Sequence, residues 1–236
     1  MARTAKRTAK RTLPKPSPRQ GEIEPAVAGS AKRKRAGARA TRSAERRDAI
    51  LAAALDEFAA GGFAATRLDD VARRAKVAKG TIYLHFADKE TLFQELIRAM
   101  LTPVVGTIEA MGQADIPIAL LADRIVDIFV REVYETRRKD VIRLVITEGP
   151  RFPKLAEFYY REVISRVMDT IRAMLRRAVE RGELKNDTLV RFPQLLAAPG
   201  IVAVIWSGLF DRFEPIDVRA MMRAHFDILF DQRSAA

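Results

Sequence analysis

The chain has 236 residues, of which 48% are hydrophobic, and it contains no cysteine and only two histidines. This length can bury one small and one medium core, and the missing cysteine excludes disulfides, thiol catalysis and cysteine-based metal sites. The formal net charge is +12, but residues 1–42 hold 13 Lys or Arg against two Glu, so the rest of the chain is close to neutral.

The basic charge therefore belongs to an N-terminal tail, residues 1–42, which contains the repeat RTAKRTAKRT and the cluster KRKR at residues 32–35. Because this tail has almost no large apolar residue, it cannot bury a core and is expected to be disordered. Three roles stay open for it. It can be a solvated extension, an arm that binds DNA nonspecifically through counterion release, or a nuclear or membrane-surface signal. It lacks the apolar stretch of a secretory signal.

A first helix is expected over residues 43–60, where Ile50, Ala54, Leu55 and Phe58 form an apolar stripe that Gly61-Gly62 ends. A second helix is expected to open at Thr66, with the threonine hydroxyl as its cap and two aspartates in the first turn. Residues 76–78 then make a turn. Three short helices around one shared core are predicted.

The helix after this turn is expected to reach about Phe86. Ala78, Ile82 and Phe86 recur every four residues and should share the buried side, whereas Gly80, Thr81, Tyr83 and Leu84 should project outward. Short polar groups near a helix N-terminus suit the major groove of DNA, and Lys79, Tyr83 and His85 can reach phosphates. The competing interpretations are that Tyr83 is a core aromatic, that Thr81 only starts the helix, and that His85 is a neutral packing residue.

A fourth helix is predicted after Asp88, which should be its N-cap, with Lys89 in the first turn near a possible phosphate. Its apolar stripe consists of Leu92, Phe93, Leu96, Ile97 and Met100.

The motif VAKGTIYLHFADKETLF, after a helix, a Gly-Gly stop and TRLDDVARRA, resembles the DNA-binding half of the TetR family of bacterial transcriptional regulators. The resemblance covers residues 44–100. It implies that Thr66, Lys79, Gly80, Thr81, Tyr83, His85 and Lys89 contact DNA; for Thr66 the expectation rests on the resemblance alone. Lys76 stands where the family has glycine, which predicts a positive φ, and Ala78 stands where the family has a Ser or Thr cap.

The second half is expected to be all-α because no strand-like alternation appears. Helical segments are predicted at residues 118–135, 140–146, 153–181, 188–210 and 216–230. Residues 147–153, with one glycine and two prolines, form a loop that either gates a pocket or only turns the chain. The longest apolar run, residues 195–210, is too short and interrupted to span a membrane.

The resemblance implies that this half forms a homodimer through its last two helices and holds a small effector. A dimer is also expected because a single three-helix DNA-binding domain covers only one half-site of an operator. The apolar run at residues 195–206 and the residues Met221, Met222, Phe226, Leu229 and Phe230 are the predicted interface. Because aromatic and Met side chains line apolar cavities, the effector candidates are Phe129, Tyr134, Phe152, Phe158, Tyr159, Met168 and Trp206, with Ile142 beside them.

The sequence thus predicts an all-α protein with a tail (1–42), a three-helix helix-turn-helix domain (43–90) and a larger helical effector-binding and dimerisation domain (91–236). We expect a cytoplasmic, homodimeric repressor that binds double-stranded DNA at an inverted-repeat operator and is released by a mainly apolar small molecule. The alternative is an architectural protein that binds DNA nonspecifically through its tail. An enzyme is disfavoured because no nucleophile, metal-ligand cluster or phosphate loop appears, and neither a cofactor nor a metal is expected.

Overall fold

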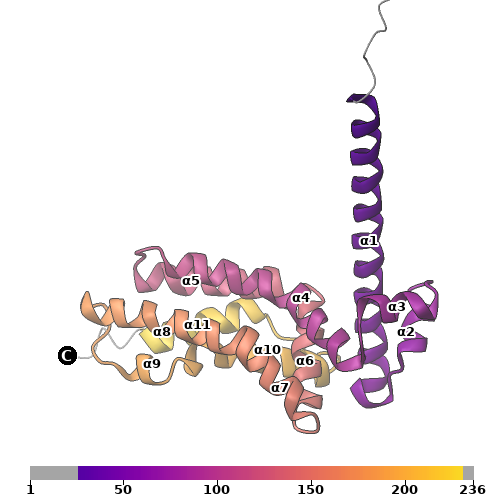
Figure 1. The fold of residues 1–236 in the computed structure, drawn as a ribbon. Helices are drawn as coiled ribbons and strands as arrows, with labels where there is room; N and C mark the ends of the chain where they lie inside the picture. The colour runs from indigo at the N-terminus through magenta and orange to yellow at the C-terminus, as the bar shows by residue number, and fades with distance from the viewer. Residues whose placement is uncertain (1–25, 231–236) are drawn as a thin grey trace, which may run out of the picture. The chain divides into compact units, whose positions relative to one another are not determined.

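The computed structural model describes residues 26–230, with side-chain detail from residue 39 onward (Figure 1). Within that range all regular structure is helical and no strand occurs. The N-terminal helices are α1 (Ala26–Ala65), α2 (Leu68–Arg74), α3 (Lys79–His85) and α4 (Lys89–Gly112). The expected all-α class is confirmed.

The second half begins with α5 (Ile118–Ile128), the π-helical turn η1 (Phe129–Tyr134) and α6 (Arg138–Glu148). A nearly continuous helix follows, made of α7 (Pro153–Tyr159), the π-helical turn η2 (Tyr160–Ile164) and α8 (Ser165–Glu180). The chain then forms α9 (Thr188–Arg191), α10 (Gln194–Leu209) and α11 (Val218–Phe230). These elements agree with the segments predicted from the sequence to within a few residues.

Helix α1 starts earlier than the expected residue 43. It begins at Ala26, directly after Pro25, and the stretch that follows is rich in Ala, Lys and Arg, which have high helix propensity. The chain divides into two compact units between Ala44 and Glu45. Residues 39–46 of α1 are exposed. The predicted disorder of residues 1–25 lies outside the described residues.

The helix-turn-helix part is built around aromatic rings from α1 and α4. Phe58, Phe63 and Phe93 are buried, and their ring centroids lie 5.2–5.5 Å apart. The predicted glycine stop is present as a kink, because Gly62 has φ 73° and ψ 169°. Such backbone angles are open almost only to glycine, so Gly62 interrupts α1 and lets Phe63 turn back into the core.

Two local predictions in this part were wrong. The N-cap of α2 is Arg67 and not Thr66, whose buried hydroxyl donates to the carbonyls of Gly62 (2.8 Å) and Glu57 (3.1 Å). Thr66 therefore closes the end of α1 instead of opening α2. Ala78 was expected on the buried side of α3, but it is the extended N-cap residue before the helix and is exposed, whereas Ile82 and Phe86 are buried.

Two apolar cores share the compact unit that begins at Glu45. The first joins α1 to α4 with α6 and α7, and the second joins α5, α8, α10 and α11. Helix α4 reaches both because it runs to Gly112 with Pro103 inside it, well past the stripe predicted for residues 89–100. Phe129, Ile164 and Val167 pack against both cores, which places them at the junction where a cavity lies.

Candidate functional site

Helices α2 and α3 are joined by a tight turn whose backbone is fixed by hydrogen bonds. The amide of Val77 donates to the carbonyl of Ala72 (3.1 Å), and the amide of Lys76 donates to that of Arg73 (3.2 Å). Lys76 has φ 55°, the left-handed value predicted for this position. The turn therefore has the geometry that glycine would adopt freely, with an exposed lysine in its place.

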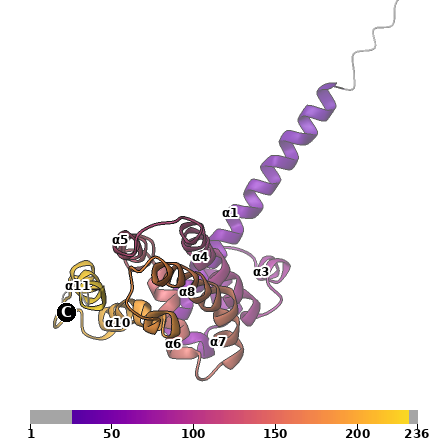
Figure 2. The ribbon, with the colours of Figure 1, turned by 90° about the vertical axis from the view of Figure 1, so that its left-hand side faces the viewer.

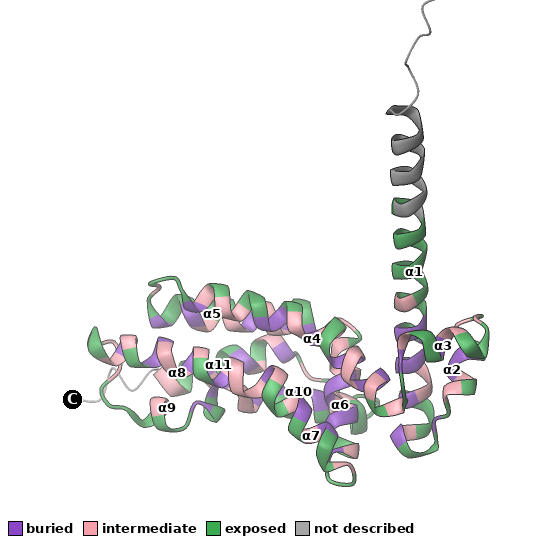
Figure 3. Cartoon of the chain, in the orientation of Figure 1, coloured by how far each residue is buried: buried purple, intermediate pink, exposed green. Residues whose placement is uncertain are grey.

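The outer face of α3 is exposed (Figure 3). Ile82 is fully buried beneath it, while Tyr83 is 50% exposed and Leu84 is 85% exposed. Gly80 also lies on this face, and a β-carbon placed there would meet nothing within 4 Å. Leu84 was expected to project outward but was not among the predicted DNA-contacting residues; it is the more exposed of the two. Thr81 is half-buried at the edge of the face.

The two lysines predicted to bind phosphate are both engaged within the chain. The ammonium of Lys79 donates to Asp69 on α2 (2.8 Å), and this bond raises the pKa of Lys79. The ammonium of Lys89 donates to the carbonyl of Ala64 (2.9 Å) and lies 4.7 Å from the centre of the Phe63 ring; burial lowers its pKa. Contact with phosphate would therefore require each lysine to exchange a partner.

Three other predicted residues near α3 are Asp88, His85 and Thr66. Asp88 caps α4 by accepting from the amide of Thr91 (2.7 Å), as expected, and this bond lowers the pKa of Asp88. His85 is half-buried, with its ring centroid 6.1 Å from that of Phe86. Thr66 is 6% exposed, so its side chain does not belong to the outer face.

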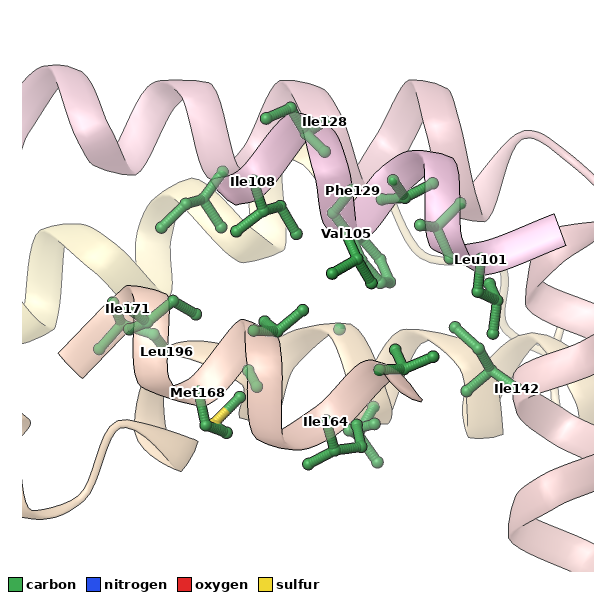
Figure 4. Close-up of a pocket in the computed structure, with 18 of the residues that line it drawn as sticks. Leu101, Val105, Ile108, Ile128, Phe129, Ile142, Ile164, Met168, Ile171 and Leu196 are labelled. Atoms are coloured by element: carbon green, nitrogen blue, oxygen red, sulfur yellow. The ribbon is translucent and has the colours of Figure 1, made fainter. Parts of the chain in front are cut away.

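A cavity of about 160 Å³ lies among α4, η1, α8 and α10 in the second half (Figure 4). Phe129 from η1, Val105 from α4 and Met168 from α8 point into it, and Leu196 from α10 closes another side. Gly200 lets α10 approach closely, because a β-carbon there would lie 2.9 Å from the Phe129 ring. A larger residue at that position would push the ring into the cavity.

Of the predicted effector residues, Phe129, Tyr159 and Met168 line this cavity, as does Ile142. The other four do not line it. Phe152 packs edge-on against Phe63, Phe158 lies under Arg98, Tyr134 lies under Lys139, and the indole of Trp206 donates to the carbonyl of Glu214. Residues 147–153 do not line it either; the segment between α6 and α7 connects these two helices.

The sequence analysis missed most of the aliphatic wall. Helix α4 contributes Leu101, Val104, Val105 and Ile108. Their residue types are those of any helical core, and only the packing of α4 against α8 shows that they face an open space. They carry neither an aromatic ring nor sulfur, the features that marked the predicted effector residues.

Comparison with known families decides the identity of the chain. Residues 50–96 match the family model described as bacterial regulatory proteins, tetR family, and residues 122–225 match the tetracyclin repressor-like C-terminal domain. The chain belongs to the TetR family. Its members are transcriptional regulators that bind DNA through a helix-turn-helix, and the first match contains α2 and α3 whole.

Similar TetR-family proteins cover most of the chain. The regulator AcrR of Shigella flexneri is 26% identical over 79% of this chain and 88% of its own length. The fold resembles that of SmeT, the repressor of a Stenotrophomonas maltophilia multidrug efflux pump, in complex with triclosan: the TM-score is 0.69 and the identity 20%, over 80% of this chain and 91% of that one.

A further solved structure with the TetR-family fold is FadR of Bacillus subtilis in complex with stearoyl-CoA. Its TM-score is 0.64 at 19% identity, over 77% of this chain and 96% of that one. At these identities the two solved structures establish a shared fold.

Helix α6 of this TetR-family chain touches both the cavity and the helix-turn-helix part. Ile142 lines the cavity, and the N-cap residue Arg137 forms an ion pair of 2.6 Å with Asp56 on α1. At the other end, the carboxylate of Glu148 lies against Gly62, where an added β-carbon would be 2.6 Å from its oxygen. Helix α6 thus joins the cavity wall to α1 at Asp56, before the kink, and at Gly62, the kink itself.

The last two helices, α10 and α11, carry exposed apolar side chains. The helices themselves lie across the ribbon from α3 in Figure 2. On α10 these are Leu195, Ile201, Val202, Ile205 and Leu209, and on α11 the most exposed is Ile228. Met222 and Phe226, which were predicted for an interface, are buried in the protein's own core. The outward set is therefore carried mainly by α10.

Among the described residues there is no helix long and apolar enough to cross a membrane. There is also no group of three or more His, Asp or Glu side chains arranged to hold a metal ion in that part of the chain.

Proposed function

We propose that this protein is a homodimeric transcriptional repressor whose α3 reads an inverted-repeat operator and whose cavity binds a small apolar effector that releases the DNA. The observation that carries the proposal is the outer face of α3. Gly80 costs an exposed helix about 1 kcal/mol relative to alanine, yet nothing within the chain needs the space it leaves. Close approach of a partner accounts for it.

The exposed side chains on this face suit a DNA groove. Tyr83 can donate to a phosphate, Thr81 can bond a base edge, and Leu84 can pack against a thymine methyl group. Lys79, His85 and Lys89 complete the proposed contact set, with the lysines exchanging their present partners for phosphate. Thr66 supports the surface from inside, because its hydroxyl is already bonded.

Dimerisation is supported by the exposed apolar residues of α10. Leucine, isoleucine and valine side chains gathered on one helix face favour burial against a second copy of the chain. A two-fold symmetric dimer then carries two α3 helices that can contact DNA. Two half-sites about one DNA turn apart, roughly 34–36 Å, then give useful specificity.

Effector control is supported by α6. A molecule in the cavity presses on Ile142, and α6 is bonded to α1 through Arg137 and lies against Gly62 through Glu148. A ligand weakens operator binding 100-fold only if it binds the DNA-free state better by about 2.7 kcal/mol. The ligand complexes of SmeT and FadR support a ligand-responsive role here.

We infer further that the protein acts in the cytoplasm, where bacterial DNA lies, and regulates transcription instead of catalysing a reaction. The test is selection of genomic DNA fragments by the purified full-length chain at about 150 mM salt. A shared inverted-repeat motif in the bound fragments supports a dimeric, sequence-reading regulator. Binding without any shared motif would favour the alternative, an architectural protein whose DNA binding is dominated by the basic tail.

A further inference from the structure

The chemistry of the cavity wall specifies the kind of effector that fits. Among the residues that line it, Tyr159 is the only one whose side chain carries an oxygen or a nitrogen. The rest of the wall consists of aliphatic side chains, Phe129, two methionines and Gly200. No charged side chain of the described residues reaches the wall.

This wall excludes an ionised ligand group. A carboxylate or ammonium that leaves water is stabilised in a protein only by an opposite charge or several hydrogen bonds. The cavity offers one hydroxyl. A charged group that enters the cavity would therefore lose more hydration free energy than its contacts with the wall restore. Transfer of hydrocarbon surface from water into the cavity is favourable.

Tyr159 is the group that can recognise a polar atom. It is the last residue of α7, directly before η2, and its hydroxyl makes no hydrogen bond within the described chain. Burial raises the pKa of Tyr159 to about 12, further above neutral pH than the ordinary phenol value. The phenol is therefore protonated, as any tyrosine is near pH 7, and can both donate and accept. An unpaired hydroxyl next to a cavity leaves a favourable interaction for a ligand to complete.

The space has room for about one ring. The volume of about 160 Å³ is close to that of an engineered protein cavity of roughly 150 Å³ that binds benzene. Two π-helical turns border this space: η1 contributes Phe129 and η2 contributes Ile164. Such turns occur preferentially at functional sites.

We propose that the cavity binds a neutral, single-ring-sized hydrophobic molecule with one uncharged oxygen, and that the Tyr159 hydroxyl bonds that oxygen. This proposal rests on the proposed function, in which the same cavity holds the effector. Tyr159 would then set the specificity of the site, while the aliphatic wall supplies most of the affinity.

The test is calorimetric titration of the full-length, DNA-free protein with three probes of similar size: para-cresol, toluene and para-toluate. We expect para-cresol to bind about tenfold more tightly than toluene, and para-toluate not to bind. In Tyr159→Phe the affinity for para-cresol should fall about tenfold to the level of toluene, with toluene unchanged. The matched control is Tyr160→Phe, since Tyr160 is 60% exposed and does not line the cavity.

A second variant, Val167→Phe, fills part of the cavity and should weaken para-cresol and toluene together. Binding of para-toluate as tight as that of para-cresol, an unchanged para-cresol affinity in Tyr159→Phe, or no binding of any probe would overturn the inference. DNA-fragment binding by the same preparation separates the two proposals. If a motif is selected but no probe binds, only the effector class is wrong; if para-cresol binds but no motif is selected, only the regulator is wrong.

Discussion

The carboxylate of Glu148, at the end of α6, lies against the backbone of Gly62 at the kink of α1. This contact joins an element of the cavity wall to the helix that supports the DNA-reading part. Gly62 meets two requirements at once, because its backbone angles exclude other residues and the space beside its α-carbon is filled by Glu148.

Replacement of Gly62 by alanine should therefore destabilise the protein by about 1–3 kcal/mol, from backbone strain and the clash with Glu148. The matched control is Gly61→Ala, where the β-carbon meets only Ala65 at 4.0 Å and φ is not positive. That change should be neutral or slightly stabilising. Urea unfolding of both variants measures the difference. Equal stability of the two variants would show that the kink is not fixed by Gly62.

The buried phenol of Tyr159 predicts a loss of stability at high pH. Its pKa rises from 10.0 to about 12 on folding, so between these values the unfolded chain has released a proton that the folded chain retains. The stabilisation is complete below pH 10 and is lost as the pH rises through 12, by about 2.7 kcal/mol at most. Between pH 10 and 12 the melting temperature of Tyr159→Phe should fall less than that of wild type. An equal fall in the two melting temperatures would contradict a buried phenol.

The exposed face of α10 predicts self-association. Val202→Glu puts a charge on the proposed interface and should convert the dimer to a monomer at micromolar concentration in sedimentation velocity runs. Leu120→Glu on α5 is the matched control, since Leu120 is 44% exposed and Val202 is 46% exposed. The Leu120 variant should stay dimeric. A monomeric wild type, or a dimeric Val202→Glu variant, would refute this interface.

The basic tail predicts a change in salt dependence. Residues 1–40 hold almost no large apolar residue, so their deletion should leave the core intact. Each basic residue that neutralises a phosphate adds about 0.9 to the slope of log affinity against log salt, so the truncated chain should show weaker binding to all DNA and a flatter slope. Preference for the operator should be unchanged. If the truncated chain shows the same salt slope as the full chain, the tail does not contact DNA phosphates.

Local patterns in the sequence predicted the helix-turn-helix part closely. The apolar spacing placed Ile82 and Phe86 inside and Tyr83 outside, Asp88 was identified as a cap, and Lys76 was expected at positive φ. Each of these depends on residues within one or two helical turns. Thr66 was misassigned because a hydroxyl before a helix can equally donate back to the preceding helix, and the carbonyls of Glu57 and Gly62 lie there.

The cavity could be predicted only in part, because its wall comes from helices distant in sequence. Phe129, Tyr159 and Met168 were found by residue type, but the same rule selected Phe152 and Trp206, which pack elsewhere. The aliphatic residues of α4 carry no local sign of an open space. The start of α1 at Ala26 was missed because charge and proline content outweighed the helix propensity of the Ala-rich stretch.

The central claim, that the outer face of α3 reads DNA, is tested most directly with one substitution. Binding of the selected operator fragment by Tyr83→Ala is compared in fluorescence anisotropy with binding by Tyr160→Ala, a second exposed tyrosine that lies in η2 and not in α3. We predict that Tyr83→Ala loses at least tenfold in affinity with an unchanged melting temperature, while Tyr160→Ala binds as wild type does. Full operator affinity in the Tyr83 variant would contradict the assignment of α3 as the reading helix.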